Sequence, residues 1–242
     1  MQEAKEAAGE AAAQLVEDGM TLGLGTGSTT TCALRAIGRR VEREQLNVAG
    51  VPTSPAAAHT AREAGIPLVS FDDLSVENST ARLDLAFDGA DEVDPELRVV
   101  KGRGAAHSRE RVVAHQAERF VALVDPSKEV DRLGTQAPVP VEFIPMARAP
   151  VTRAIERLGG RPALRTGKRK DGPVVTDQGL WVIDAHFDEA DADSEAGIDD
   201  PEAMSEALRA IPGVLDHGLF LSEVTTVLIG HPDGSATTRR SE

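Results

Sequence analysis

The chain of 242 residues is poor in cysteine and lysine and has no long apolar run. Its single cysteine, Cys32, cannot form an internal disulfide and has no second cysteine with which to bind zinc. The longest apolar stretches fall well short of the roughly 18 residues that indicate a membrane span. The first residues are charged and have helical periodicity, unlike a signal peptide. We therefore expect a cytoplasmic protein without a membrane segment.

Positive charge is scarce, because 26 lysines and arginines stand against 40 aspartates and glutamates, giving a net charge of −14. Nucleic acids are bound by basic surfaces, so this balance argues against a nucleic-acid partner. Only five of the basic residues are lysines, which leaves 21 arginines. An acidic surface with little lysine suits a protein adapted to high salt, which we hold as a hypothesis, although GC-rich coding also favours arginine over lysine.

The first part of the chain alternates short apolar runs with helical patterns. Such alternation is typical of an α/β fold with a mainly parallel, Rossmann-like sheet covered by helices, in which ligands bind at the carboxyl ends of the strands. The runs predicted as strands are MTLGLG (20–25), LNVAGVPTS (46–54), IPLVSF (66–71), LDLAF (83–87), RVV (98–100) and RFVALVD (119–125).

After Pro138 the predicted elements follow the order β, α, β, β, α, β, which indicates a smaller ferredoxin-like α+β domain. The final apolar run, VTTVLIG (224–230), has no place in that unit, and we expect it to return to the first sheet. The sequence thus predicts a catalytic α/β domain of residues 1–134 plus 221–242 and a small domain of residues 135–220.

The segment GLGTGSTTT (23–31) joins a predicted strand to a predicted helix. Glycines let the backbone approach a ligand closely, and the N–H groups at a helix start attract anions. A dinucleotide fingerprint needs a third glycine where Ser28 stands, and a Walker loop needs a lysine that is missing. The hydroxyls of Thr26, Ser28 and Thr29 suit a small phosphate monoester, but a plain helix cap on a tight turn explains them equally well.

Four acids occur within DGADEVD (88–94), directly after a predicted strand. Gly89 permits a sharp turn, so Asp88 and Asp91 are expected at the ligand-binding edge of the sheet. Carboxylates there can act as acids or bases, position hydroxyls or hold magnesium. The structural alternative is that aspartates end strands by accepting hydrogen bonds from nearby backbone N–H groups.

Two further segments place lysines after predicted strands. In KGRGAAHSRERVV (101–113), Lys101 and two glycines lead into a helix with Glu110 near its start, and in VDPSKEV (124–130), Lys128 follows a proline turn. Glu110 is a candidate base, although an acid in a first helical turn is also favoured by the helix dipole. An ordinary solvated surface position is the alternative for Lys128.

Metal binding is not expected. His107 and His115 stand eight residues apart rather than four, with no evident third ligand. Near the acidic stretch 187–200, five residues have a spacing similar to that of a calcium-binding EF-hand: Asp191, Asp193, Glu195, Ile198 and Glu202. Ala196 stands where that loop needs glycine, and the preceding segment is predicted to be a strand rather than a helix.

Taken jointly, several segments resemble the A-type ribose-5-phosphate isomerase family in order and approximate spacing. These are GTGSTT, DGADEVD, KGRGAAHSRE, VDPSK, VEFIPMA and PDG. The resemblance implies interconversion of ribose 5-phosphate and ribulose 5-phosphate, a step of the non-oxidative pentose phosphate pathway, without a cofactor. It also implies a homodimer or homotetramer whose partner is a small sugar phosphate.

Carried over by motif, the resemblance makes Glu110 the proton acceptor. An aldose–ketose shift passes through an enediolate, so a cation is needed at the oxyanion, and Lys101 is expected there. Asp88 is expected to assist ring opening and Asp91 to position hydroxyls. The residues expected to line the substrate site are Thr26, Gly27, Ser28, Thr29, Asp88, Gly89, Ala90, Asp91, Lys101, Gly102, Arg103, Gly104, Lys128 and, near the phosphate, Lys5.

The glycine loop departs from the family pattern. Members commonly show KGGGAAL where this chain has KGRGAAH, so we expect Arg103 to alter the loop's fine geometry and to add a phosphate contact. Two other classes remain open. A sugar-phosphate sensor would ordinarily carry a basic helix-turn-helix, which the sequence does not show, and a coenzyme A transferase would form a covalent thioester on a glutamate.

Overall fold

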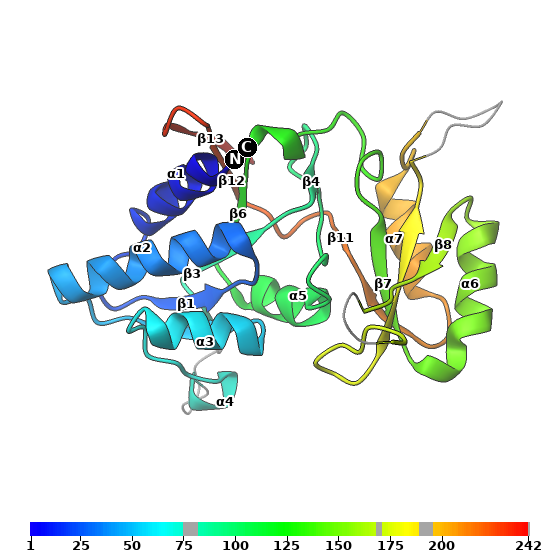
Figure 1. Ribbon diagram of the computed structural model, residues 1–242, viewed down its shortest axis with the longest axis horizontal. Helices are drawn as coiled ribbons and strands as arrows, with labels where there is room; N and C mark the ends of the chain where they lie inside the picture. The colour runs from blue at the N-terminus through cyan, green and yellow to red at the C-terminus, as the bar shows by residue number, and fades with distance from the viewer. Residues whose placement is uncertain (75–81, 168–170, 189–195, 242) are drawn as a thin grey trace. The chain divides into compact units, whose positions relative to one another are not determined.

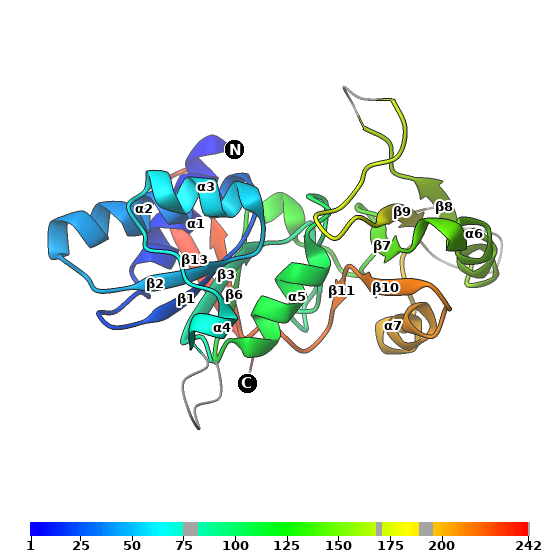
Figure 2. The same ribbon diagram turned by 90° about the horizontal axis from the view of Figure 1, so that it is seen from below.

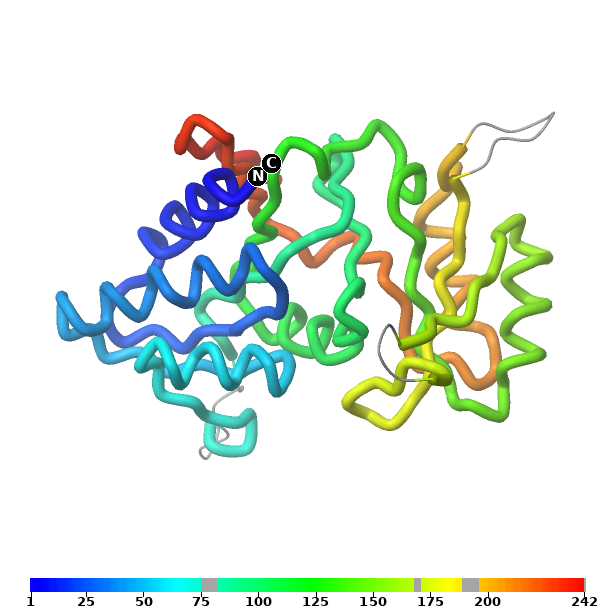
Figure 3. The backbone as a smooth tube through the Cα atoms, in the orientation of Figure 1, coloured from blue at the N-terminus to red at the C-terminus, as the bar shows by residue number. Residues whose placement is uncertain are grey.

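The computed structural model describes residues 1–74, 82–167, 171–188 and 196–241 (Figure 1). The chain divides into two compact units, of which unit 1 comprises residues 1–90, 109–128 and 222–242, and unit 2 comprises residues 91–108 and 129–221. The chain passes from one unit to the other four times, and its course can be followed in Figure 3. The domain boundaries near residues 134 and 221 that the sequence suggests stay a prediction.

Unit 1 is built on a six-stranded sheet with the order β13-β12-β6-β3-β1-β2. Neighbouring strands from β12 to β2 are parallel, and β13 joins β12 antiparallel at the edge. The expected return of the run 224–230 to this sheet is confirmed, because β12 pairs with β6. The strands are β1 (Thr21–Leu24), β2 (Ala49–Pro52), β3 (Leu85–Gly89), β6 (Phe120–Val124), β12 (Thr226–Gly230) and β13 (Ala236–Arg240).

Helices cover both faces of this sheet, as predicted for a Rossmann-like fold (Figure 2). One face packs on α1 (Gln2–Ala13), α2 (Ser28–Glu44) and α3 (Pro55–Glu63), and α4 (Phe71–Leu74) is a single short turn. The other face packs on α5 (His107–Gln116), where a Cβ at Gly23 would lie 2.5 Å from Val113 Cγ1. Glycine at position 23 therefore lets the helix approach β1 closely. No helix in the described ranges combines the length and apolar character that crossing a membrane requires.

Unit 2 contains a four-stranded antiparallel sheet with the order β10-β7-β9-β8. Its elements follow one another as β, α, β, β, α, β with the first strand beside the third, which is the predicted ferredoxin-like arrangement. The elements are β7 (Val139–Phe143), α6 (Arg148–Arg157), β8 (Arg161–Leu164), β9 (Trp181–His186), α7 (Pro201–Arg209) and β10 (Val214–His217). A short 3-10 helix, η2 (Pro145–Ala147), precedes α6.

Unit 2 also holds a small three-stranded sheet with the order β11-β5-β4. Its strands are β4 (Glu92–Val93), β5 (Val99–Val100) and β11 (Leu219–Phe220). The predicted strand at 98–100 therefore pairs here rather than in the six-stranded sheet. Because β11 is antiparallel to β5, Gly218 lies beside Lys101, whose backbone N–H donates to the Gly218 carbonyl at 2.8 Å.

Candidate active site

The carboxyl ends of three neighbouring parallel strands in unit 1 carry most of the predicted site residues. The turn Thr26–Thr29 follows β1, Asp88 to Ala90 close β3, and Lys128 follows β6. Since β6, β3 and β1 are adjacent in the sheet, these segments lie side by side at one edge. This is the edge at which parallel α/β sheets bind ligands.

Asp88 is held in place by backbone donors. Its side chain is buried, and its Oδ1 accepts hydrogen bonds from Thr26 N at 3.1 Å and Gly89 N at 2.8 Å. A Cβ at Gly25 would lie 2.5 Å from this oxygen and would overlap the Phe87 carbonyl, so the chain needs glycine there. These contacts tie the turn after β1 to the end of β3.

The hydroxyl of Thr26 joins two residues that the sequence analysis did not single out. Thr26 Oγ1 lies 2.8 Å from Thr53 Oγ1 and donates to Ser54 Oγ at 2.6 Å. Ser54 caps α3, because its Oγ accepts from Ala57 N at 3.0 Å. A serine directly before Pro55 is a helix-start pattern visible in the sequence, but the strand predicted over 46–54 includes this serine.

The start of α2 combines backbone donors with a cation. Gly27, the N-cap residue, has φ of 122°, a region that favours glycine. Lys5 of α1 donates from Nζ to Ser28 Oγ at 2.9 Å. An ammonium group and the free N–H groups of a helix N-terminus both attract anions, so this turn suits a phosphate.

Lys128 ends the short 3-10 helix η1 (Pro126–Lys128) and is half-buried. The turn is shaped by buried Asp125, whose Oδ1 accepts from Ser127 N at 3.0 Å and Ser127 Oγ at 2.5 Å. Lys128 N donates to the Asp125 carbonyl at 3.0 Å. The direction in which the chain leaves β6, and with it the position of Lys128, is therefore fixed by local hydrogen bonds.

Glu110 lies in the first turn of α5 and is only 3% exposed. The next residue, Arg111, forms an ion pair with Glu223, and His115 Nε2 lies 3.6 Å from the same carboxylate. These contacts fasten α5 to the C-terminal part of unit 1. They fix the helix that presents the Glu110 carboxyl group.

The glycine loop, Lys101–Gly104, belongs to unit 2. Lys101 is only 2% exposed, and its Nζ lies 5.6 Å from the centroid of the Phe220 ring, a cation–π distance. A Cβ at Gly218 would overlap the Lys101 carbonyl, so close pairing of these two segments requires glycine. The loop therefore begins with a cation held in a largely dry setting.

The loop itself is a tight turn in which Ala105 N donates to the Gly102 carbonyl at 3.0 Å. Gly102 has φ of 103°, and a Cβ on it would lie 2.8 Å from His107 Nδ1, so the His107 ring packs directly against the glycine. Asp91 Oδ2 accepts from Arg103 N at 3.2 Å. Within unit 2, Asp91 and the glycine loop are thus brought together.

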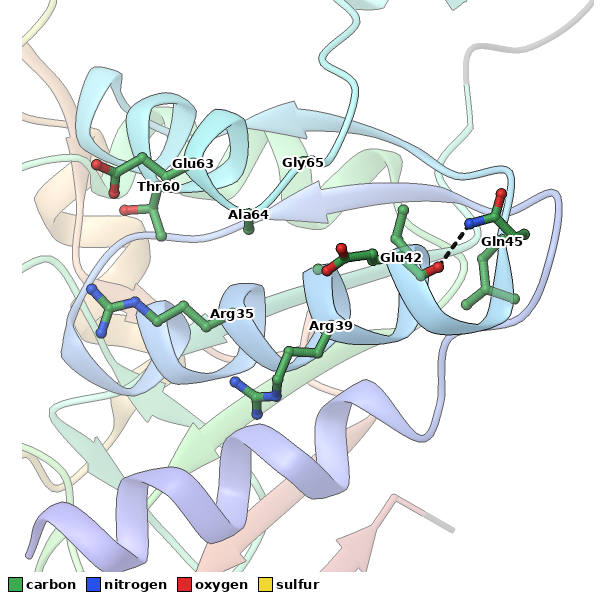
Figure 4. Close-up of a pocket in the computed structure, with 11 residues that line it drawn as sticks. Arg35, Arg39, Glu42, Gln45, Thr60, Glu63, Ala64 and Gly65 are labelled. Atoms are coloured by element: carbon green, nitrogen blue, oxygen red, sulfur yellow. Dashed lines mark hydrogen bonds between the residues drawn. The ribbon is translucent and has the colours of Figure 1, made fainter.

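A groove of about 670 Å³ lies between α2 and α3 in unit 1 (Figure 4). Its lining includes Arg35, Arg39, Glu42, Thr60 and Glu63, and none of the predicted site residues. Helices of such units run antiparallel to the strands they cover, so the C-terminal halves of α2 and α3 lie toward the amino ends of the strands. We therefore place the candidate site at the opposite edge, not in this groove.

In unit 2, a cavity of about 580 Å³ is lined by two predicted site residues, Asp91 and Arg103, together with Arg165 and Asp184. Among the residues that the structure describes, no group of three histidine, cysteine or acidic side chains is arranged to hold a metal ion. The EF-hand-like positions Asp191, Asp193 and Glu195 lie outside the described residues.

The comparisons with known proteins agree with one another. The family model described as ribose 5-phosphate isomerase A (phosphoriboisomerase A) matches residues 49–234. Ribose-5-phosphate isomerase A of Thermosynechococcus vestitus is 48% identical over 97% of this chain and 94% of its own length. The protein of the same name from Haloarcula marismortui is 49% identical, covering 96% of this chain and 93% of its own.

Solved structures are similar over nearly the whole chain. Ribose 5-phosphate isomerase A from Methanocaldococcus jannaschii has a TM-score of 0.88 at 40% identity, with 98% of each chain covered. A D-ribose-5-phosphate isomerase in complex with phospho-erythronic acid has a TM-score of 0.89 at 38% identity, again with 98% of each chain covered.

Proposed function

The chain belongs to the ribose 5-phosphate isomerase A family and interconverts ribose 5-phosphate and ribulose 5-phosphate, and we propose that it does so through an enediolate with Glu110 as the proton carrier. The observation that carries the activity is the similarity to isomerases of that name over nearly the full length of both chains. The residue roles that follow are argued from the contacts of each group.

Glu110 is assigned as the base and acid. The reaction removes a proton from C2 and returns one to C1, and these carbons are adjacent, so one carboxylate can make both transfers. Its burial supports this role, since a carboxylate shielded from bulk water can keep the transferred proton from exchanging away during turnover.

Lys101 is assigned to the oxyanion that develops as the carbonyl becomes an enediolate. A fixed cation in a low-dielectric setting stabilises such charge far better than a solvated one, and loss of such a group costs about 3–4 kcal/mol of transition-state stabilisation. The burial of Lys101 and its position over Phe220 support this assignment.

Asp88 and Asp91 are assigned to the sugar ring and its hydroxyls. Ribose 5-phosphate rests as a closed ring, so a proton must pass between the ring oxygen and the anomeric hydroxyl before isomerisation. One oxygen of Asp88 already accepts two backbone N–H groups, so its orientation is fixed, as ring opening requires. Asp91, which accepts from the glycine loop, is assigned to positioning hydroxyls.

The phosphate is assigned to the turn Thr26–Thr29, Lys5 and Lys128. The contact between Lys5 Nζ and Ser28 Oγ supports this, since it brings a cation to the start of α2. A phosphate bound far from the reacting carbons supplies binding energy that positions them. Gly27, Gly89, Ala90, Gly102, Arg103 and Gly104 complete the proposed substrate-binding set.

The assembly and the cellular location are inferred from membership of the same family. We infer a homodimer or homotetramer that works in the cytoplasm on a free sugar phosphate. Light scattering is expected to give a particle mass of two or four times 25.6 kDa. A particle with the mass of one chain would contradict the inferred assembly without touching the activity.

The direct test of the function is ketose formation by the purified protein from ribose 5-phosphate in the presence of EDTA. We expect turnover to continue under these conditions. Phospho-erythronic acid joins a phosphate to a carboxylate whose delocalised charge resembles that of an enediolate, so it should inhibit competitively. Absence of ketose formation would contradict the function, and a covalent thioester on mass measurement with a coenzyme A ester would favour a transferase instead.

A further inference from the structure

An arginine next to the antiparallel sheet forms hydrogen bonds with the glycine loop of unit 2. Arg165 directly follows β8, and Asp184 lies in the neighbouring strand β9. Nη1 of Arg165 donates to the carbonyl oxygens of Gly102 at 2.9 Å and Arg103 at 3.1 Å. Its Nε donates to Asp184 Oδ2 at 2.9 Å, and its Nη2 donates to Oδ1 of the same carboxylate. One guanidinium group therefore joins two consecutive loop carbonyls to a carboxylate.

The ion pair sets the orientation of the guanidinium plane. Both side chains are mostly buried, with 14% of Arg165 and 18% of Asp184 exposed. The Asp184 carboxylate accepts from Nε and Nη2 and so fixes the plane of the guanidinium group. Nη1 is then directed away from the carboxylate, toward the loop. A lysine has a single nitrogen without this fork, so it cannot reproduce both sets of contacts.

Because Arg165 orients two loop carbonyls, it also orients the N–H groups of the same peptides. In a planar trans peptide, the N–H points opposite to the C=O. When the Gly102 and Arg103 carbonyls turn toward Arg165, the N–H groups of Arg103 and Gly104 must turn away from it. The Arg103 N–H does so, since it donates to Asp91 Oδ2 at 3.2 Å.

The loop needs an external hold, because one end of the turn has a strained backbone. Gly102 has φ of 103°, which glycine tolerates, but Ala105, which has a side chain, has φ of 58°. Conformations of this kind persist where the surroundings fix them. The guanidinium group of Arg165 supplies such fixation, with two hydrogen bonds to the loop carbonyls and two to the Asp184 carboxylate.

We propose that Arg165 is a positioning residue for the isomerisation, oriented by Asp184. It turns the Gly104 N–H toward the sugar oxygens, and it turns the Arg103 N–H toward Asp91, the residue assigned to the hydroxyls. This rests on the proposed function, in which the glycine loop contacts the substrate. N–H groups aimed at developing negative charge act most strongly in the transition state. Loss of the alignment therefore lowers kcat more than it raises KM.

The test compares Arg165→Lys, Arg165→Ala and Asp184→Asn with a matched control. The control is Arg161→Ala, which removes an arginine from the start of the same β8 strand, where it pairs with Asp188 at 3.2 Å. We expect kcat to fall at least about tenfold in both Arg165 variants, with KM changed by less than about threefold. The control is expected to stay within about twofold of wild type.

Chemical rescue separates positioning from a merely structural role. Ethylguanidinium added to Arg165→Ala should restore kcat by at least about fivefold, because it supplies the missing fork. If Arg165→Ala does not fold, Arg165→Lys tests the proposal instead, by whether its kcat falls while its KM changes little. Values of kcat within about twofold of wild type in the Arg165 variants, or a loss that ethylguanidinium leaves unchanged, would overturn the proposal. A wild type without ketose formation would instead contradict the function itself.

Discussion

The backbone N–H of Thr26 donates to Asp88 Oδ1 at 3.1 Å, which joins the turn after β1 to the end of β3. The turn carries the proposed phosphate contacts, and Asp88 carries the proposed ring-opening proton. Together with the hydrogen bond from Gly25 N to the Phe87 carbonyl at 2.9 Å, this contact fixes the distance between the two proposed parts of the site. This spacing depends on Gly25, over which the Asp88 carboxylate lies.

Replacement of Gly25 by alanine should push these two segments apart. A Cβ at this position would lie 2.5 Å from Asp88 Oδ1 and would overlap the Phe87 carbonyl, so Gly25→Ala should lower the free energy of unfolding by about 1–3 kcal/mol and reduce kcat/KM. Urea denaturation measures the first effect.

The stability control for Gly25→Ala is Gly89→Ala. The nearest atom to a Cβ at Gly89 is the Leu123 carbonyl oxygen at 3.9 Å, so this variant should keep its unfolding free energy within about 0.5 kcal/mol of wild type. Equal losses in the two variants would show that the close approach at Gly25 is not the cause.

Removal of the Lys5 charge should weaken substrate binding more than turnover. Lys5→Met deletes the ammonium that contacts Ser28 at the start of α2, and we expect KM for ribose 5-phosphate to rise about tenfold with kcat within a few-fold. The matched control is Arg82→Met, which removes one positive charge just before β3, at the opposite edge of the sheet. A similar KM in both variants would contradict the assignment of Lys5 to the phosphate site.

Buried Glu92 should make stability fall as the pH rises. Its carboxylate accepts from Gly134 N and Gln136 N at 2.5 Å each and from Ala137 N at 2.7 Å. Burial is nevertheless the largest influence, and it raises the pKa of Glu92 above its ordinary value of 4.5. The folded protein then binds this proton more tightly than the unfolded chain does. Between the ordinary and the raised pKa, the unfolding free energy therefore decreases with increasing pH.

Glu92→Gln isolates this effect, because glutamine does not titrate. Unfolding free energies of wild type and variant, measured by urea from about pH 4 to about pH 8, should show wild type losing stability relative to the variant as the pH rises. An advantage of wild type that grows with pH would contradict the raised pKa.

High salt should stabilise the protein if its acidic surface is an adaptation. At about 1 M salt the screening length falls to about 3 Å, so repulsion within a chain of net charge −14 is largely removed. We expect Tm to rise between low and molar KCl, with activity retained. Reversible unfolding or loss of activity caused by salt alone would refute the hypothesis.

The parallel core could be predicted because its central strands are short, continuous apolar runs in the sequence. β6 is apolar and buried at every position, as strands covered on both faces are, and the same pattern in β12 identified its return to the sheet. β13, with the sequence ATTRR, is mostly exposed at the edge and carries no such pattern, so it was not predicted. The strand expected at 66–71 was wrong, because this edge segment makes only an isolated bridge from Leu68 to Gly50, and residues from Phe71 begin α4.

The residues that support the site were harder to find than those proposed to contact substrate. Thr26, Asp88 and Lys101 follow strands and carry chemical groups, so their positions in the chain single them out. Arg165 looks like an ordinary arginine after a strand, and its contact with Gly102 joins residues 63 apart in the chain. Sequence periodicity carries no signal for such long-range hydrogen bonds, and only the folded chain reveals them.

The central claim, that one carboxylate moves the proton between C2 and C1, is tested most directly by Glu110→Gln. Glutamine keeps the size of the side chain but cannot accept the proton. The measurement is kcat for ketose formation beside the dissociation constant of phospho-erythronic acid on the same preparation. We predict that kcat falls by at least about 10²-fold while the dissociation constant stays within a few-fold of wild type. Near-normal turnover in this variant would contradict the account.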